Sequence, residues 1–229
     1  MKIFTCGMLK TYLECPFKYN LIYNENIKIP SENNFSEIGN EIHSLINYFY
    51  KGFDIKKMTD LVYSGKRFDL KELWNNFSEI KPKKLLKSEY SFNAKIGDNC
   101  MLTGRIDGFY KIGKSYVIVD WKTGSDKLDV DNDMQTMIYL YSVYNLLKNS
   151  NRIENYEDLS IEYYFLKTKK IRKVSLTKTL FNKTKKDIIS LTNKIITETE
   201  YLKASSPACK NCEYKNFCTQ TYEQLLNML

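Results

Sequence analysis

The residues best suited to chemistry lie at the end of one apolar stretch. In "VIVDWKTG", residues 117–124, a run of β-branched side chains ends in Asp120 and Lys122. Consecutive strand residues point to opposite faces, so Asp120 and Lys122 would project together, roughly 7 Å apart along the backbone, with Trp121 turned away. An isolated D-x-K tripeptide is usually a solvated ion pair at a strand end. It therefore needs partners elsewhere in the chain before it predicts a site.

A second carboxylate precedes this strand, in "TGRIDGFY", where Asp107 follows the core residue Ile106 and points the opposite way. If the two strands pair as a hairpin, Asp107 and Asp120 converge at one end of the sheet. Hard carboxylate ligands there would hold Mg²⁺ or Mn²⁺, which polarises a phosphate and activates water, while an ammonium group stabilises developing charge. This set therefore indicates metal-assisted phosphodiester hydrolysis.

The chain has a single histidine, His43. Ser-His-Asp hydrolysis and two-histidine zinc sites need more imidazoles or different neighbours, so the chemistry must run mainly on carboxylates, lysine or cysteine. His43 lies on the flank of an apolar stripe in "FSEIGNEIHSLINYFY", whose spacing predicts a helix over 35–50. Such a histidine is more often structural, but it is available as a neutral nitrogen ligand or an acid–base group.

Hydrophobic periodicity predicts the elements that would position these groups. Alternating or buried apolar patterns indicate strands at 88–96, 100–112, 115–122, 160–166 and 171–177, the first three joined by short turns. Further helices are predicted near 71–77, at 134–147 and over 179–203, with a short terminal helix in the tail. Gln135 and Tyr139 share one face of the second of these, at i and i+4. The order predicts an α/β domain around a mixed sheet.

The composition favours a polyanionic partner. The 35 Lys and Arg residues exceed the 27 Asp and Glu residues, for a net charge of +8, which points to nucleic acid ahead of membrane. The same excess accompanies AT-rich codon usage, since Lys, Asn and Ile are all abundant, so charge alone leaves both readings open. The basic stretches "KPKKLLK" at 81–87 and "KTKKIRKV" at 167–174 are either phosphate contacts or solvated turns.

The cysteine pattern predicts a second site. The start of the chain has no apolar signal-peptide region and no run long enough to span a membrane, so we expect a cytoplasmic, reducing setting without disulfides. Cys209, Cys212 and Cys218 form a C-x2-C-x5-C pattern typical of a metal or cluster. A fourth thiol would come from Cys6, Cys15 or Cys100, and spacing alone leaves zinc and an iron–sulfur cluster open.

The order of these motifs resembles the RecB-like branch of the PD-(D/E)XK nuclease superfamily. There a helix histidine is followed by GxxD, D/E-x-K and Q-x-x-x-Y, which here read His43, "GRID", "DWK" and "QTMIY". The resemblance implies a restriction-endonuclease-like mixed sheet flanked by helices. It also implies that His43, Asp107, Asp120 and the carbonyl of Trp121 bind the metal. Lys122 would orient or deprotonate the attacking water, with Gln135 and Tyr139 supporting the site and the DNA. Glu89 carries over only weakly, as a further acidic residue.

The resemblance also selects the fourth thiol. "LECPFKYNL" is similar to the segment with which iron–sulfur relatives, such as the AddB nuclease domain and the CRISPR-associated "Cas-four" nucleases, supply their first ligand. It implies a four-iron–four-sulfur cluster on Cys15, Cys209, Cys212 and Cys218, leaving Cys6 and Cys100 as packing residues. The expected division is a segment 1–35 with the first cluster cysteine, a nuclease core 36–203 and an iron–sulfur tail 204–229, all in one domain.

We therefore expect a Mg²⁺- or Mn²⁺-dependent DNA nuclease, and the resemblance favours an exonuclease on single strands or DNA ends. Relatives of this kind act in CRISPR adaptation, recombination and repair, or phage DNA processing, some with helicases or CRISPR adaptation proteins as partners. Two alternatives stay open. One is an iron–sulfur DNA-binding or assembly module that cuts nothing, and the other is a structure-specific endonuclease.

Overall fold

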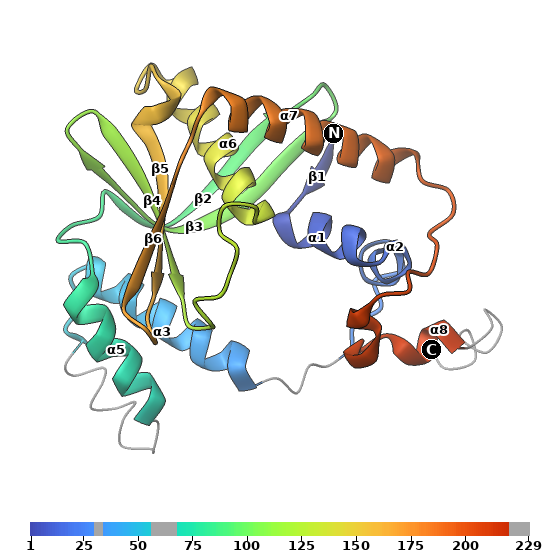
Figure 1. Cartoon of the computed structure of the whole chain (residues 1–229), viewed down its shortest axis with the longest axis horizontal. Coiled ribbons are helices and arrows are strands. Elements are labelled where there is room, and N and C mark those ends of the chain that lie inside the picture. Colours follow the sequence, from blue (N-terminus) through green and yellow to red (C-terminus); the bar gives the residue numbers. More distant parts are fainter. Residues whose placement is uncertain (30–33, 56–67, 220–229) are drawn as a thin grey trace.

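A six-stranded mixed sheet forms the centre of the molecule, in a computed structural model that describes residues 1–29, 34–55 and 68–219 (Figure 1). The strand order is β1-β3-β4-β5-β6, and β2 pairs with β3 off this path. The strands are β1 (Lys2–Phe4), β2 (Lys87–Ile96), β3 (Cys100–Ile112), β4 (Ser115–Lys122), β5 (Leu159–Phe165) and β6 (Lys170–Ser175). Parallel pairing of β4 with β5 and of β1 with β3 makes the sheet mixed, which confirms the expected fold class.

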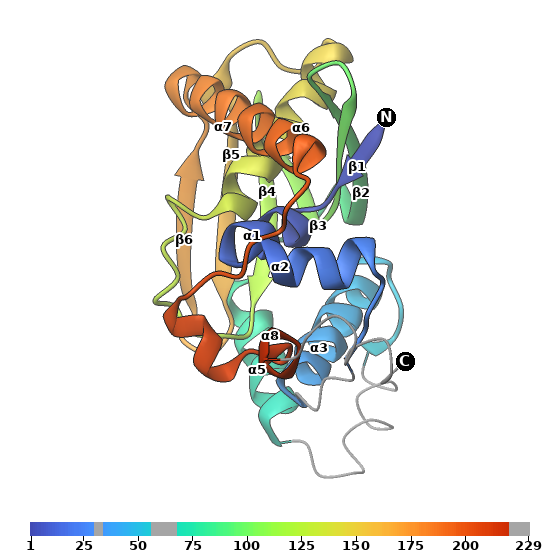
Figure 2. The ribbon, with the colours of Figure 1, turned by 90° about the vertical axis from the view of Figure 1, so that its right-hand side faces the viewer.

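Helices cover both faces of this sheet (Figure 2). One core cluster packs α1 (Cys6–Glu14), α6 (Met134–Asn149) and α7 (Lys178–Thr197) against the sheet, and the other packs α3 (Asn34–Tyr50) and α5 (Phe68–Ile80). On β4, Ile118 belongs to the first cluster while Val119 and Trp121 belong to the second. A strand buried on both faces explains the continuous apolar run before Asp120.

The remaining described elements are short. They are α2 (Pro16–Tyr19), a π-helical turn at Asn20–Asn24, 3₁₀ turns at Tyr156–Asp158 and Pro207–Asn211, and α8 (Lys215–Thr219). In the described part of the chain, no helix is long and apolar enough to cross a membrane.

The N-terminal elements were not expected from sequence. Strand β1 has only three residues, and α1 begins directly after it, where the side chain of Thr5 accepts a hydrogen bond from the Met8 amide and caps the helix. A strand of three residues is too short to show a periodic pattern, so neither β1 nor the start of α1 could be predicted from the sequence. Together β1 and α1 place the chain start against β3 and α6.

The long C-terminal helix is shorter than predicted. It ends at Thr197 rather than Lys203, since Glu198 is extended and its carboxylate accepts a hydrogen bond from Tyr12 on α1 at 2.6 Å. Leu202, expected on the buried face, lies beyond the helix and is 68% exposed. The helix α8 is described from Lys215 to Thr219, and the rest of the expected terminal helix falls on residues outside the described ranges.

Two glycines allow the close packing around β3. A Cβ at Gly104 would lie 2.6 Å from Cζ of Phe92, a buried residue of β2 that is directly opposite Gly104 in the β2–β3 register. A Cβ at Gly108 would lie 2.9 Å from Cδ1 of Leu85 and 3.2 Å from Cβ of Val119. Both positions therefore exclude a side chain, and both flank Asp107.

We expect Gly104→Ala to lower the free energy of unfolding by about 1–3 kcal/mol, the usual cost of overpacking a core, because the Phe92 ring must move. Gly124→Ala is the matched control, since a Cβ there would meet nothing within 4 Å. It should change stability by less than about 0.5 kcal/mol. Urea denaturation of the two variants measures the difference, and equal stabilities would contradict the packing argument.

Candidate active site

Strands β3 and β4 separate next to the predicted residues. Their last pair is Gly108 with Val119, so continued pairing would set Asp107 directly opposite Asp120. Two carboxylates directly opposite each other are destabilising, which favours separation at this point. Because β2 occupies the other edge of β3 along the same residues, β1 and β4 share one edge and leave 103–107 unpaired there. We call this opening the β3–β4 fork.

Side chains replace the missing ladder in the fork. The amide of Trp121 donates to Oδ2 of Asp107 at 2.8 Å, and the carbonyl of Trp121 lies 2.9 Å from Nε2 of His43. The hydroxyl of Tyr139, on α6, donates to the carbonyl of Arg105 on β3 at 2.8 Å. Tyr139 is buried, so its visible role is to hold β3, and nothing places it against DNA. The indole of Trp121 turns to the opposite face, as expected, where Tyr164 packs on it.

His43 connects the α3 face to the fork. Its Nδ1 lies 3.3 Å from Oδ1 of Asp107. Burial lowers the pKa of His43, but the hydrogen bond and the negative charge of Asp107 outweigh it, and the pKa ends above its ordinary value. With both ring nitrogens facing oxygen acceptors, the imidazolium form satisfies both contacts. Metal ligation by His43 would require loss of one of these protons.

Asp120, Lys122 and Gln135 form a second part of the same site. The Gln135 amide nitrogen donates to Oδ1 of Asp120 at 2.6 Å, and its carbonyl accepts from Nζ of Lys122 at 3.1 Å. Nζ of Lys122 also lies 2.7 Å from Oδ2 of Asp120. Burial, with the nearby charge of Asp107, raises the pKa of Asp120 to about 6 despite the lysine. The D-x-K spacing on one strand face and the start of α6 bring the three together.

Glu89 joins the site, although the sequence supported it only weakly. Within the described ranges, ligand atoms of His43, Glu89 and Asp107 lie within 4.8 Å of one another and form the one group of three or more that could hold a metal. Glu89 faces Asp107 in the β2–β3 register but makes no ladder pair, and its φ of 49° is rare outside glycine. Counting the register back from the hairpin turn would have revealed this position.

This donor set fits a hard divalent cation. It offers one imidazole and two carboxylates within 4.8 Å of one another, and Oδ2 of Asp120 is buried without a hydrogen bond of good geometry in the described structure. Each carboxylate also has one cationic neighbour: Glu89 has Arg105, Asp107 has His43 and Asp120 has Lys122. Without a cation, the site is therefore neutralised by its own side chains.

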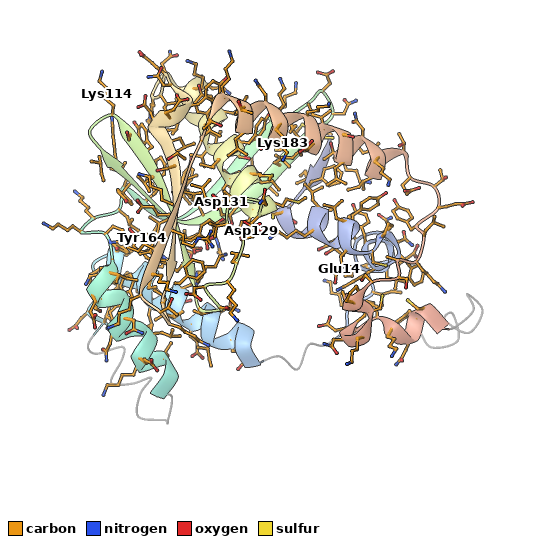
Figure 3. The ribbon with its side chains drawn as sticks, viewed as in Figure 1. Glu14, Lys114, Asp129, Asp131, Tyr164 and Lys183 are labelled. Atoms are coloured by element: carbon orange, nitrogen blue, oxygen red, sulfur yellow. The ribbon has the colours of Figure 1, made fainter. Side chains whose placement is uncertain are left out.

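The second basic stretch largely engages protein groups, and the first does so through Lys81. In the second, Lys169, Lys170 and Arg172 pair with Glu79, Asp126 and Asp131, and Figure 3 shows Asp131 with Asp129 on the loop between β4 and α6. In the first, Nζ of Lys81 lies over the rings of Phe49 and Phe77. These contacts favour a structural role for the second stretch, most of which lies on β6 rather than in a turn.

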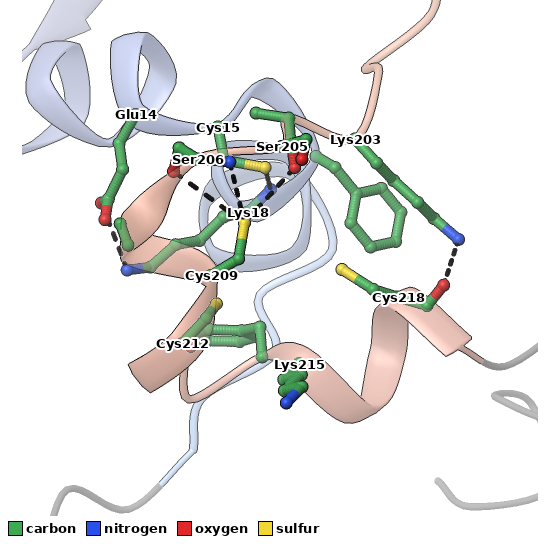
Figure 4. Close-up of a pocket in the computed structure, with 14 residues that line it drawn as sticks. Glu14, Cys15, Lys18, Lys203, Ser205, Ser206, Cys209, Cys212, Lys215 and Cys218 are labelled. Carbon is green, nitrogen blue, oxygen red and sulfur yellow. Dashed lines mark hydrogen bonds and ion pairs between the residues drawn. The ribbon is translucent and has the colours of Figure 1, made fainter.

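Four cysteines line a separate cavity of about 300 Å³. Cys15, at the start of α2, faces Cys209, Cys212 and Cys218 of the C-terminal segment across it (Figure 4). Backbone amides approach two of the sulfurs: that of Lys18 lies 3.5 Å from Sγ of Cys15, and that of Ser206 lies 3.4 Å from Sγ of Cys209. Cys100 is buried and Cys6 packs against the core, both outside this cavity.

A model of the PD-(D/E)XK nuclease superfamily matches residues 4–79 and 64–219, and so covers most of the sequence. The chain belongs to the PD-(D/E)XK nuclease superfamily. Membership makes it a nuclease-type hydrolase by family, with DNA as the substrate class that the family implies. No curated protein sequence matched the chain.

A solved structure supports this fold. A protein from Eubacterium rectale named "Putative exonuclease" is 14% identical, with a TM-score of 0.56 over 95% of this chain and 88% of that one. A protein named SSO0001 is 17% identical, with a TM-score of 0.42 over 93% of this chain and 94% of that one. At 14% identity, the likeness to the protein from Eubacterium rectale shows a shared fold.

We expect Mn²⁺ binding at pH 6.5 to release protons, because the contact with Asp107 raises the pKa of His43 and a cation must displace the proton from the imidazolium before the ring nitrogen can bind it. Affinity should rise with pH and level off above the pKa of His43. Calorimetry in two buffers with different ionisation enthalpies counts the protons. His43→Gln should bind more weakly and release fewer protons. Equal proton release by this variant and the parent would rule out His43 as their source.

Proposed function

We propose that this chain is a Mg²⁺- or Mn²⁺-dependent nuclease that hydrolyses phosphodiester bonds of DNA. The observation that carries the proposal is the single network at the β3–β4 fork. Residues from α3, β3, β4 and α6 meet there, although His43 and Gln135 lie far apart in the sequence. Membership of a nuclease superfamily gives this network its chemistry.

His43, Asp107 and Asp120 would hold the cation, together with Glu89 and the carbonyl of Trp121. A bound divalent cation supplies Lewis-acid polarisation of the phosphate and a more acidic water. The carbonyl of Trp121 makes no ladder hydrogen bond to β3, because the two strands separate before this residue. A cation would have to replace only its contact with His43. The protein fixes the donors beforehand through the fork hydrogen bonds and the buried indole of Trp121.

Lys122 would orient the attacking water and stabilise the negative charge that develops on the phosphate. Gln135 fixes the lysine, because its one amide group contacts both Lys122 and Asp120. The ring of Tyr163 lies beneath the ammonium group, with Nζ 5.3 Å from the ring centroid. These contacts limit the rotamers of a long side chain and so favour a fixed position for the reacting water.

The substrate we propose is single-stranded DNA or a DNA end, with little sequence specificity. The net charge of +8 supports a polyanionic substrate, and the longer described helices α1, α3, α5, α6 and α7 pack into the two cores rather than standing out as helices that could read a DNA groove. An exonuclease mode rests on the resemblance to end-processing relatives. Helicase or CRISPR adaptation proteins are proposed partners on the same ground.

We further propose that the cysteine cavity holds a four-iron–four-sulfur cluster that joins the two ends of the domain. All four thiols line it, and amides point at two of the sulfurs, as hydrogen bonds to cluster sulfurs do. The segments also meet directly, since the Phe17 amide donates to the Leu202 carbonyl and Tyr214 donates to the Ile27 carbonyl. We therefore propose one domain in which the cluster joins segment 1–35 to segment 204–229, with the nuclease core 36–203 between them.

The sulfur spacing favours a cluster over a single zinc ion. Tetrahedral zinc with bonds of about 2.3 Å holds its thiolates about 3.8 Å apart. Within the described residues no three of the four sulfurs lie within 4.8 Å of one another. A cluster that gives each thiolate a different iron accepts wider spacing.

We expect Lys122→Ala to reduce cleavage of linear single-stranded DNA in Mn²⁺ by about 10²-fold or more, the usual scale for an acid–base or charge-stabilising group. DNA binding in Ca²⁺ should be nearly unchanged, since the fold and the cation ligands remain. Lys114→Ala, in the turn at the far end of β3 and β4 (Figure 3), is the matched control and should cut like the parent. Unchanged cleavage by Lys122→Ala would overturn the site.

The same assay separates the alternatives. A circular single strand that survives while the linear strand is degraded supports the exonuclease mode, and cleavage of the circle supports an endonuclease. A protein that binds both strands yet cuts neither in Mg²⁺ or Mn²⁺ would be the binding module instead.

For the cluster, we expect the purified protein to be brown and to contain about four iron atoms and four inorganic sulfides per chain. Cys15→Ala or Cys209→Ala should lose the visible absorbance, because each removes one ligand. Cys100→Ala is the control, since this buried cysteine lies outside the cavity, and its absorbance should persist. A colourless parent with one zinc ion per chain would contradict the cluster.

A further inference from the structure

Arg105 is an exposed cation that pairs with a candidate metal ligand, Glu89. Nε of Arg105 lies 2.6 Å from Oε2 of Glu89, and the side chain of Arg105 is 67% exposed while that of Glu89 is 18% exposed. His43 and Lys122 also pair with carboxylates of the site, but their side chains are only 27% and 24% exposed. Arg105 is the exposed cation that neutralises a member of the group formed by His43, Glu89 and Asp107.

The two roles of Glu89 conflict. A divalent cation held by Glu89, His43 and Asp107 would stand within a few ångströms of the guanidinium of Arg105, and like charges at that range repel strongly. Glu89 also occupies a backbone conformation that non-glycine residues rarely adopt. Its carboxylate is thus aimed at the ligand group at some cost in strain, while an exposed arginine holds it there in the absence of a cation.

The backbone of Arg105 is fixed while its side chain is free to move. Its carbonyl accepts the hydrogen bond from Tyr139, and β2 pairs along the same part of β3. The guanidinium, by contrast, extends into solvent two residues from Asp107. A planar guanidinium matches two oxygens of a phosphate as well as it matches a carboxylate.

We propose that Arg105 is a phosphate-binding residue of this site and that Glu89 restrains it until a divalent cation takes over the Glu89 carboxylate. Cation binding then releases the guanidinium to a phosphate of the DNA strand next to the one being cut. The order matters, because the strand is gripped fully only when the site holds its cation. This inference rests on the proposed nuclease function and deepens it by naming the contact that couples cation binding to substrate binding.

A double-mutant cycle without metal tests the restraint. The probe is a fluorescein-labelled oligothymidylate, with binding followed by anisotropy in EDTA for the parent, Arg105→Gln, Glu89→Gln and the double variant. In the parent background Arg105→Gln should change the affinity little, since Glu89 already occupies the guanidinium. In the Glu89→Gln background it should weaken binding about tenfold, the scale of one charged hydrogen bond.

The salt dependence gives a second reading of the same contact. Glu89→Gln should show a steeper slope of log affinity against log salt than the double variant by about 0.7, the value for one phosphate contact on a single strand. Arg105→Lys, placed in the Glu89→Gln background, should retain part of the affinity because it keeps the charge without the fork geometry. Arg152→Gln, an exposed arginine at the end of α6, is the matched control and should leave the cycle unchanged.

The metal arm tests reciprocity. Arg105→Gln should bind Mn²⁺ severalfold more tightly than the parent in calorimetry without DNA, because the competing cation is gone. An Arg105→Gln effect on DNA binding that is the same with and without Glu89, or Mn²⁺ affinity that does not change, would overturn the restraint even if the parent cuts DNA. Failure of the parent to bind the oligonucleotide in EDTA and in Ca²⁺ would overturn the proposed function itself, and with it the restraint of Arg105 by Glu89.

Discussion

The separation of β4 from β3 is the constraint on which the site depends. It occurs where continued pairing would set Asp107 against Asp120, and it leaves the amide and carbonyl of Trp121 without strand partners on that side. Buried backbone groups left unpaired cost about 1–3 kcal/mol each. Asp107 and His43 satisfy both. The groups best placed to bind a cation are therefore also the groups that stabilise the opening, and removing one of them costs structure as well as chemistry.

The fork is held open from three sides. Trp121 packs against Tyr50, Phe77 and Tyr164 on the α3–α5 face, which fixes β4. On the other face α6 holds β3 through Tyr139 and β4 through Gln135. From the chain start, Lys10 of α1 pairs with Asp133, the residue just before α6. Because Cys15 directly follows α1, this one helix connects the start of α6 to the cysteine cavity.

Much of this could be read from the sequence, for identifiable reasons. The strands around 88–122 have clear alternation and tight turns, and β4 shows the two-sided burial of a central strand, so their positions agree closely with the expected ranges. The spacing of Asp120 and Lys122, and of Gln135 and Tyr139, follows from one period of a strand and one turn of a helix. Hidden from view were features set by tertiary contacts: the three-residue β1, the end of α7 at the Tyr12–Glu198 bond, and the fork itself. A hairpin was expected to carry the two carboxylates, whereas they lie just beyond its last pair.

Glu89 shows why site membership is harder to predict than secondary structure. The position of the Glu89 side chain depends on the β2–β3 register and on a local φ of 49°, and no sequence pattern predicts that φ. Yet the charges explain why it is there. His43, Lys122 and Arg105 each neutralise one carboxylate, so the resting site carries little net charge despite three buried or half-buried acids. A divalent cation entering this arrangement cannot simply add to it. In the proposed function it would have to displace a proton from His43 and compete with the two side-chain cations Lys122 and Arg105, and each of those cations would then be available to a phosphate of the substrate. The charge balance that stabilises the metal-free fold would therefore supply, through the same contacts, the charges that the proposed reaction needs.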